Sequence, residues 1–404
     1  MENYRSVELD IDPDVMAEVV RVYTRFITTR PFVDIPIRVL TLEEAILGVP
    51  GTVDPLDHSA SPGYPWNQYP GGRSSVYTVT DKGVLVWGSK SDEFKSLINR
   101  FTYTLMQGNT PGFVAKDSLK SELRKEAKRL KPRLISGATL TQTVLFKMYF
   151  ATYFAYLTQT NLSTDRFIGM DPIRDWDHME RKFRHISGGI RNMTGDYSAY
   201  DGPVVPEFME ILASIANAWY GDSDDSSVGR LRLTLARSSV VQYHAFGDVI
   251  SLWLGGFGSG AYVTADFNSQ RNTLMEMYSF AVTARSLGKD WRDCLSRFFE
   301  GVFIKTMGDD KRMAVSDEFS FHNNKTHAEV VLKSFKLVYT DAKKSGSIVP
   351  FDDDENLSFV KRDAVYHEDL DLFFGALEIN TILNMVCYTK GEDVVDNIRH
   401  RALS

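Results

Sequence analysis

The chain has 404 residues, of which 43% are hydrophobic, so it is long enough to bury a large core shared by two or three subdomains. No window approaches the roughly 18 uninterrupted apolar residues of a membrane span, and the start, MENYRSVELDIDPD, lacks the basic-then-apolar layout of a signal peptide. The only cysteines, Cys294 and Cys387, are too few for a disulfide framework or a CxxC metal site, so we expect a soluble globular protein of a reducing compartment.

The net charge is −7, which argues against a surface that binds nucleic acid everywhere. Basic residues are instead concentrated in one strip from Lys116 to Arg133, where eight Lys or Arg accompany three acidic residues. Such a strip suits an enzyme that guides a polyanion into one channel. The alternative is a solvated helix face, because basic residues recur there at every fourth position.

Turns rich in Gly, Pro and Ser at 58–75 come before the first clear strand, which we expect at about 190–196. A helix is predicted to begin at Pro206, because proline suits the first helical position, and to end before Gly221. Asp196 therefore ends a strand that leads to a helix.

The sequence between this strand and helix is Asp196-Tyr-Ser-Ala-Tyr-Asp201. The two acids are five residues apart and cannot both point the same way along a strand, so we expect different roles. Asp196 is predicted to bind a metal ion and Asp201 to sense the sugar of an incoming nucleotide. The alternative for Asp201 is a helix cap or turn residue.

A glycine-rich segment at 255–260 precedes a helix predicted to begin near Thr264. Thr264, Asn268 and Asn272 follow at i, i+4 and i+8, so they form one polar stripe, which could read a ribose hydroxyl. The alternative is an amphipathic helix whose polar stripe faces water.

Two apolar runs at 301–307 and 311–315 flank Gly308-Asp309-Asp310, a pattern that predicts a hairpin with both aspartates on its turn. A helix is expected at about 326–336. Two aspartates from distant strands, Asp196 and Asp309, would supply the carboxylate clamp that phosphoryl transfer with two Mg²⁺ or Mn²⁺ ions needs, although an isolated GDD is more often a plain turn. Strands and helices in this order predict an α+β core, with antiparallel sheet and helices on one face.

The order of these motifs from about Gly63 to His400 resembles the RNA-dependent RNA polymerases of the picornavirus-like supergroup of positive-strand RNA viruses. The resemblance implies a right-hand fold of fingers, palm and thumb with an antiparallel palm sheet backed by helices. It implies fingers at 1–150 and 241–256, palm at 151–240 and 257–362, and a partial or short thumb at 363–404.

The resemblance also assigns roles to residues. Asp310 joins Asp196 and Asp309 as a catalytic and metal-binding residue. Nucleotide binding falls to residues of the basic strip and of the two palm motifs: Arg124, Lys128, Arg133, Asp201, Ser259, Thr264 and Asn268. Lys344, favoured over Lys343, matches the lysine that protonates the departing pyrophosphate. Lys361 and Arg362 resemble the primer-gripping hairpin, and Ser61-Pro-Gly63-Tyr64-Pro65-Trp66 resembles a fingers signature.

The function implied is replication of a viral genome by transfer of ribonucleotides from NTPs to an RNA 3′ end, with two Mg²⁺ ions that Mn²⁺ may replace. The implied partners are template and primer RNA, NTPs, a viral protein primer and other replication proteins, in the host cytoplasm at replication complexes. The chain departs from the family at Met307, where Tyr is usual, and at Ser121, where Asp is common. A reverse transcriptase, an inactive RNA-binding scaffold and a metal-dependent nuclease stay open as alternatives.

Overall fold

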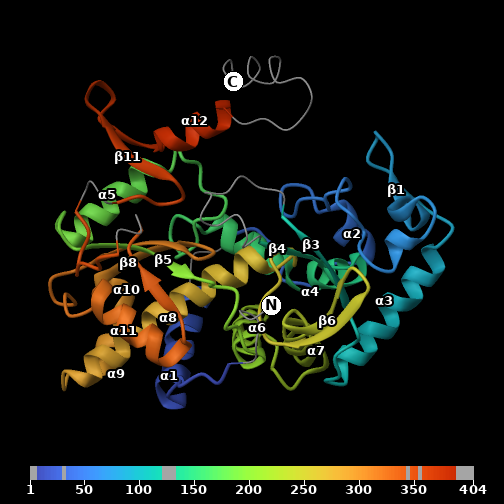
Figure 1. Cartoon of the computed structure of the whole chain (residues 1–404), viewed down its shortest axis with the longest axis horizontal. Helices are drawn as coiled ribbons and strands as arrows, with labels where there is room; N and C mark the ends of the chain where they lie inside the picture. Colours follow the sequence, from blue (N-terminus) through green and yellow to red (C-terminus); the bar gives the residue numbers. More distant parts are fainter. Residues whose placement is uncertain (1–6, 30–32, 121–132, 343–345, 354–356, 388–404) are drawn as a thin grey trace.

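The computed structural model describes residues 7–29, 33–120, 133–342, 346–353 and 357–387, and Figure 1 shows their arrangement. Two four-stranded sheets form its centre. They are called here the palm sheet and the fingers sheet.

The palm sheet has the strand order β10-β5-β9-β8 and is antiparallel throughout. Its strands are β5 (Asn192–Ser198), β8 (Val302–Met307), β9 (Asp310–Val315) and β10 (Val338–Thr340). The predicted strands at 190–196, 301–307 and 311–315 are confirmed within one or two residues. Gly308 and Asp309 form the hairpin turn as expected, whereas Asp310, also expected on the turn, begins β9.

Helices α8 (Thr264–Ser286) and α11 (Asn324–Phe335) lie under one face of the palm sheet. The expectation that helices cover one face only was wrong, because α5 (Trp176–Ser187) packs on the other face against β8 and β9. Side chains alternate between the faces of a strand, so β9 presents Lys311 to α8 and Arg312 to α5. Both faces are therefore buried.

The fingers sheet has the order β4-β3-β6-β7 and joins segments far apart in the chain. Its strands are β3 (Val114–Leu119), β4 (Leu134–Gly137), β6 (Val241–Phe246) and β7 (Val249–Leu254), with β3 and β6 parallel. Lys116, the first residue of the basic strip, therefore lies on a strand. For the part of the strip that the structure describes, the alternative of a solvated helix face was wrong. A buried Asp117–His244 contact of 3.0 Å helps to hold β6 on β3.

Helices lie beside and below the fingers sheet (Figure 1). They are α3 (Ser91–Met106), α4 (Leu140–Gln159), α6 (Pro206–Tyr220) and α7 (Ser227–Arg237). Helix α4 is buried around most of its circumference, because apolar residues occur on all of its sides and several of its polar residues are buried as well. Helix α6 begins at Pro206 and ends before Gly221, which is left-handed, as predicted.

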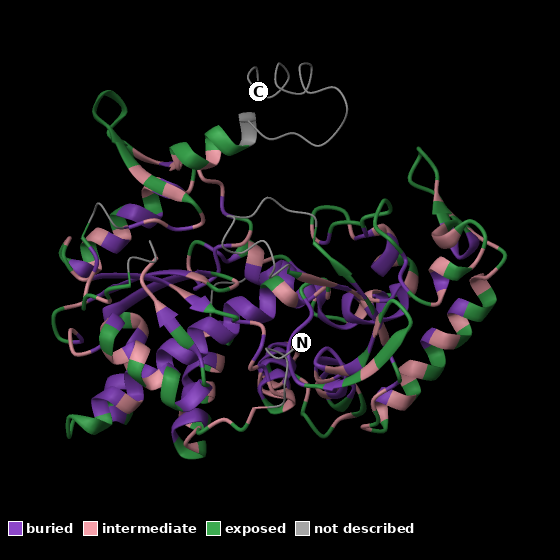
Figure 2. Ribbon diagram, viewed as in Figure 1, coloured by how far each residue is buried: buried purple, intermediate pink, exposed green. Residues whose placement is uncertain are grey.

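The remaining elements close the ends of the molecule. They are α1 (Pro13–Thr28), α2 (Leu42–Leu47), β1 (Tyr77–Val79), β2 (Leu85–Trp87), α9 (Trp291–Ser296), α10 (Phe298–Gly301), β11 (Arg362–His367), β12 (Leu372–Leu377) and α12 (Ile379–Cys387), with short 3-10 helices at Trp66–Gln68, Gly72–Ser75 and Glu368–Leu370. Burial is densest in the palm sheet and the helices below it, whereas the β11–β12 hairpin is largely exposed (Figure 2). Among the described helices, none is both long and apolar enough to cross a membrane.

Candidate active site

Three carboxylates meet at one end of the palm sheet. Asp196 lies near the end of β5, Asp309 lies on the β8–β9 turn and Asp310 begins β9. Gly195 pairs with Lys311 in the β5–β9 ladder, so Asp196 and Asp310, the next residues along, lie across from each other. Residues from two distant parts of the chain thus form one acidic site, as the sequence predicted.

The electrostatics of these carboxylates suit divalent cations. The Asp309 side chain is open to solvent, yet the surrounding protein removes enough water to raise its pKa, and the charge of Asp196 raises it further. Burial, together with the charges of Asp309 and Asp196, raises the pKa of Asp310 to about 7. Oxygen ligands that repel one another in this way fit hard cations such as Mg²⁺ or Mn²⁺.

Helix α8 holds the turn that carries Asp309. Gly308 has φ of +66°, and its backbone N–H donates to the Ser269 hydroxyl at 2.8 Å. The Asn272 amide nitrogen donates to the carbonyl oxygens of Gly308 at 3.2 Å and Asp309 at 3.0 Å. The sequence reasoning missed Ser269, because its contact with Gly308 depends on how α8 packs under the turn.

Asp201 lies next to the polar stripe of α8. The Asn268 amide nitrogen donates to its Oδ1 at 2.7 Å, and burial raises the pKa of Asp201. Of the alternatives for Asp201, the helix cap was wrong, since the N-cap of α6 is Val205 and has no side-chain cap. Asp201 does lie in the turn between β5 and α6. The exposed Arg133 is near enough for its charge to act on both Asp201 and Asp309.

The rest of the stripe also faces protein. Thr264 donates to the carbonyls of Gly258 at 3.0 Å and Ala261 at 2.8 Å, and so fixes the glycine-rich loop before α8. Ser259, which is exposed, donates to the Leu134 carbonyl at 3.3 Å. A stripe facing water was therefore the wrong alternative.

The segment before β11 reaches the carboxylates. Its Val360 backbone N–H interacts with Asp310, and the charge of Lys361 acts on the same group. Arg362 points elsewhere, because its guanidinium donates to the Gly375 carbonyl at 2.6 Å within the β11–β12 hairpin. Three other predicted site residues, Arg124, Lys128 and Lys344, lie outside the described residues, as does Lys343.

Buried charges on both sides of β9 were not foreseen. Arg312 pairs with Glu180 of α5 at 2.5 Å, and Lys311 pairs with Glu276 of α8. All four side chains are almost completely buried. The signal in the sequence is two basic residues directly after GDD, inside a strand that is otherwise apolar, which requires two buried partners.

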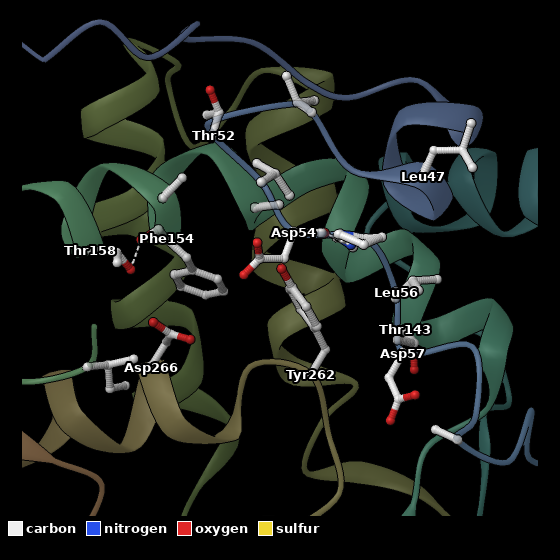
Figure 3. Close-up of a pocket in the computed structure, with 18 of the residues that line it drawn as sticks. Leu47, Thr52, Asp54, Leu56, Asp57, Thr143, Phe154, Thr158, Tyr262 and Asp266 are labelled. Carbon is white, nitrogen blue, oxygen red and sulfur yellow. Dashed lines mark hydrogen bonds between the residues drawn. The ribbon is translucent and has the colours of Figure 1, made fainter. Parts of the chain in front are cut away.

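A cavity of about 1210 Å³ opens beside the glycine-rich loop. Figure 3 shows Asp54 from the loop after α2, Phe154 and Thr158 from α4, Tyr262 from the loop before α8 and Asp266 from the start of α8 around it. At its wall Asp266 forms a buried ion pair with Arg166. Gly260 lines the cavity, so the glycine-rich loop that Thr264 fixes forms part of its wall.

Comparison with known proteins gives a consistent result. A family model described as viral RNA-dependent RNA polymerase matches residues 23–404. A solved structure described as the sicinivirus 3Dpol RNA-dependent RNA polymerase is similar with a TM-score of 0.76 and 21% identity, covering 98% of this chain and 79% of that one. The fold is therefore the right-hand polymerase fold.

Curated relatives include the replicase polyprotein of acute bee paralysis virus, 25% identical over 88% of this chain, and that of cricket paralysis virus, 24% identical over 87%. The genome polyprotein of rice tungro spherical virus (strain A) is 27% identical over 80%. The matched regions are 19%, 21% and 10% of those polyproteins, so the chain spans about a fifth or less of their length.

Proposed function

Because the chain belongs to the viral RNA-dependent RNA polymerase family, we propose that it transfers ribonucleotides from NTPs to the 3′ end of an RNA under the direction of an RNA template. The observation that supports this most strongly is the meeting of Asp196, Asp309 and Asp310 at one end of the palm sheet. The replicated RNA is proposed to be a positive-strand viral genome.

The three aspartates are proposed to hold two Mg²⁺ ions. When bound, such ions activate the attacking 3′ oxygen and neutralise charge on the leaving pyrophosphate. The raised pKa values of Asp309 and Asp310 support this assignment, because a nearby cation would relieve the repulsion that raises them.

The residues around the aspartates are proposed to select and orient the nucleotide. Asp201 and Asn268 already form a hydrogen-bonded pair, which can read a 2′-hydroxyl with one acceptor and one donor. Arg133, together with Arg124 and Lys128, is proposed to bind the triphosphate, and Lys344 to protonate pyrophosphate. Ser259 and Thr264 are proposed to shape the loop beneath the nucleotide.

Division into subdomains follows the same proposal. We propose to assign residues 1–150 and 241–256 to the fingers, 151–240 and 257–362 to the palm, and 363–404 to the thumb, with Lys361 near the primer. The pairing of β6 with β3 supports placing 241–256 with the fingers. A viral protein primer and other replication proteins are proposed partners, and the host cytoplasm, at replication complexes, is the proposed location.

The test is extension of a primed homopolymeric RNA with matched or mismatched rNTPs, with and without Mg²⁺. The wild-type chain should extend only with the matched rNTP and the metal. Asp309→Asn should lower extension by roughly a thousandfold or more, since it removes a metal ligand. Asp225→Asn, in an exposed loop after α6, is the matched control and should extend normally. Normal extension by Asp309→Asn would refute the metal assignment.

A further inference from the structure

A buried chain of hydrogen bonds leads from the helices under the palm sheet to the catalytic turn. Its last link is Asn272, which donates to the carbonyls of Gly308 and Asp309. The Tyr197 hydroxyl donates to the other end of that amide, Asn272 Oδ1, at 3.3 Å. Both side chains are buried.

His327 supports Tyr197 from below. Its Nε2 lies 2.7 Å from the Tyr197 hydroxyl and 3.0 Å from Glu276 Oε1, and its Nδ1 lies 3.1 Å from the Ser279 hydroxyl. The Ser279 hydroxyl donates to the Met275 carbonyl at 2.8 Å, so it accepts from His327 Nδ1. The Tyr197 hydroxyl lies between His327 Nε2 and Asn272 Oδ1, within hydrogen-bond distance of both.

Glu276 fixes the start of this chain. His322 Nε2 lies 2.8 Å from its Oε2, Lys311 forms an ion pair with its Oε1, and all these groups are fully buried. Ligand atoms of Glu276, His322 and His327 lie within 4.8 Å of one another, as metal ligands do. The Lys311 amine already lies against Glu276 Oε1, in the space that an ion would need, so the geometry favours a structural anchor over a metal centre.

We propose that Tyr197 is a positioning residue that couples the two metal-binding segments, an inference that rests on the proposed polymerase function. Its backbone N–H donates to Asp196 Oδ1 at 2.7 Å, and its hydroxyl reaches the Asp309 turn through Asn272. One side chain, held by His327 and Glu276, thus sets the separation of carboxylates carried by different strands. Misplacement of reacting groups by a small distance is costly in rate.

The test compares Tyr197→Phe with Tyr156→Phe in the full chain. Tyr156 is also buried, and its hydroxyl donates to the Ile27 carbonyl, away from the turn. Tyr197→Phe should lower kcat for primer extension roughly tenfold, the equivalent of one buried hydrogen bond. The KM for the NTP should stay within about twofold, while the Mg²⁺ concentration for half-maximal activity should rise. Tyr156→Phe should leave all three values near those of wild type.

A second variant separates coupling from general damage. Asn272→Ala should lower kcat too, and the double variant should lose much less than the product of the two single effects, because both break the same chain. Thermal melting of each variant shows whether it is folded. The proposed coupling is absent if Tyr197→Phe has the same kcat, KM and Mg²⁺ requirement as Tyr156→Phe. It is also absent if the losses in kcat of the two single variants multiply in the double variant. If the wild-type chain extends no primer, it is the proposed function that fails.

Discussion

At the scale of single residues, the hydrogen-bonded pair of Asp201 and Asn268 is our proposed reader of the sugar. The bond between them orients the carboxylate, whose pKa burial raises. A site built to hydrogen-bond a hydroxyl discriminates strongly against a substrate that lacks it, because its polar groups are then left unpaired.

Replacing Asn268 with Ala should therefore weaken discrimination between ribonucleotides and deoxyribonucleotides. We expect the ratio of kcat/KM for rNTP over dNTP to fall roughly tenfold. Primer extension with each nucleotide measures it. Asn109→Ala, at an exposed position after α3, should leave the ratio unchanged; an unchanged ratio in Asn268→Ala would mean that the sugar is read elsewhere.

The pKa of Asp310, about 7, predicts how stability depends on pH. Since this folded pKa exceeds the ordinary value of 3.8, the folded chain binds more protons than the unfolded chain between these pH values. In the absence of metal, stability should therefore fall as pH rises from about 4 to 7. Asp310→Asn should flatten this dependence and raise the melting temperature at pH 8 by about 2 °C or more.

Scanning calorimetry of both proteins, with a chelator present, measures this effect. Added Mg²⁺ should restore the stability of the wild-type chain at pH 8 and affect Asp310→Asn much less. Equal pH profiles for the two proteins would show that Asp310 titrates normally.

Sequence alone identified the residues whose types are tied to local geometry. Asp196 and Asp309 follow from a strand end and a Gly-Asp turn, Asp310 was added by the family resemblance, and Gly308 has a positive φ. Glu276, His322 and His327 did not stand out, because nothing in their own segments shows that they meet Lys311 in the core. Buried polar partners from separate helices become visible only once the helices are packed.

At the scale of secondary structure elements, the position of the β11–β12 hairpin depends on one close contact with α5. Gly375 packs on the Trp176 indole of α5, and a Cβ at this glycine would lie 2.3 Å from the ring. Its backbone N–H also donates to the Pro172 carbonyl at 3.1 Å. This contact fixes the hairpin, and with it the Val360–Lys361 segment beside Asp310.

Gly375→Leu should displace the hairpin from α5 and lower primer extension severalfold, through weaker binding of the primer, while the palm stays folded. Overpacking of a tight contact typically costs about 1 to 3 kcal/mol. The KM for primed RNA measures primer binding, and the melting temperature measures whether the palm stays folded. Ala376→Leu places the same side chain on the neighbouring residue, whose side chain leaves the opposite face of the strand, and should be tolerated.

Element prediction succeeded where the pattern was local and failed where partners were distant. Strands β5, β8 and β9 and helices α6, α8 and α11 were expected from periodicity and end signals. The parallel pairing of β3 with β6 was not, because no property of Val114–Leu119 indicates a partner at Val241–Phe246. Helix α5 on the second face of the palm sheet was missed for the same reason.

At the scale of the whole molecule, charge is divided between an acidic body and a basic strip. Affinity for RNA should therefore fall steeply with salt, because binding releases counterions from the phosphates. Arg133→Gln should reduce the slope of log K against log salt by about one. Lys333→Gln, on the exposed face of α11, should leave the slope unchanged in the same filter-binding titration. Equal slopes for all three proteins would place RNA away from Arg133.

The docking of α1 has a consequence for how the protein is made. Val15, Val19 and Tyr23 of α1 are completely buried, and Asp12 bonds to Tyr278 and Arg285 at the far end of α8. During translation at 5 to 20 residues per second, α1 leaves the ribosome roughly 15 to 50 seconds before these partners exist. The apolar face of α1 has no partner during this interval. Nascent chains that end before α8 should therefore bind chaperones and tend to aggregate.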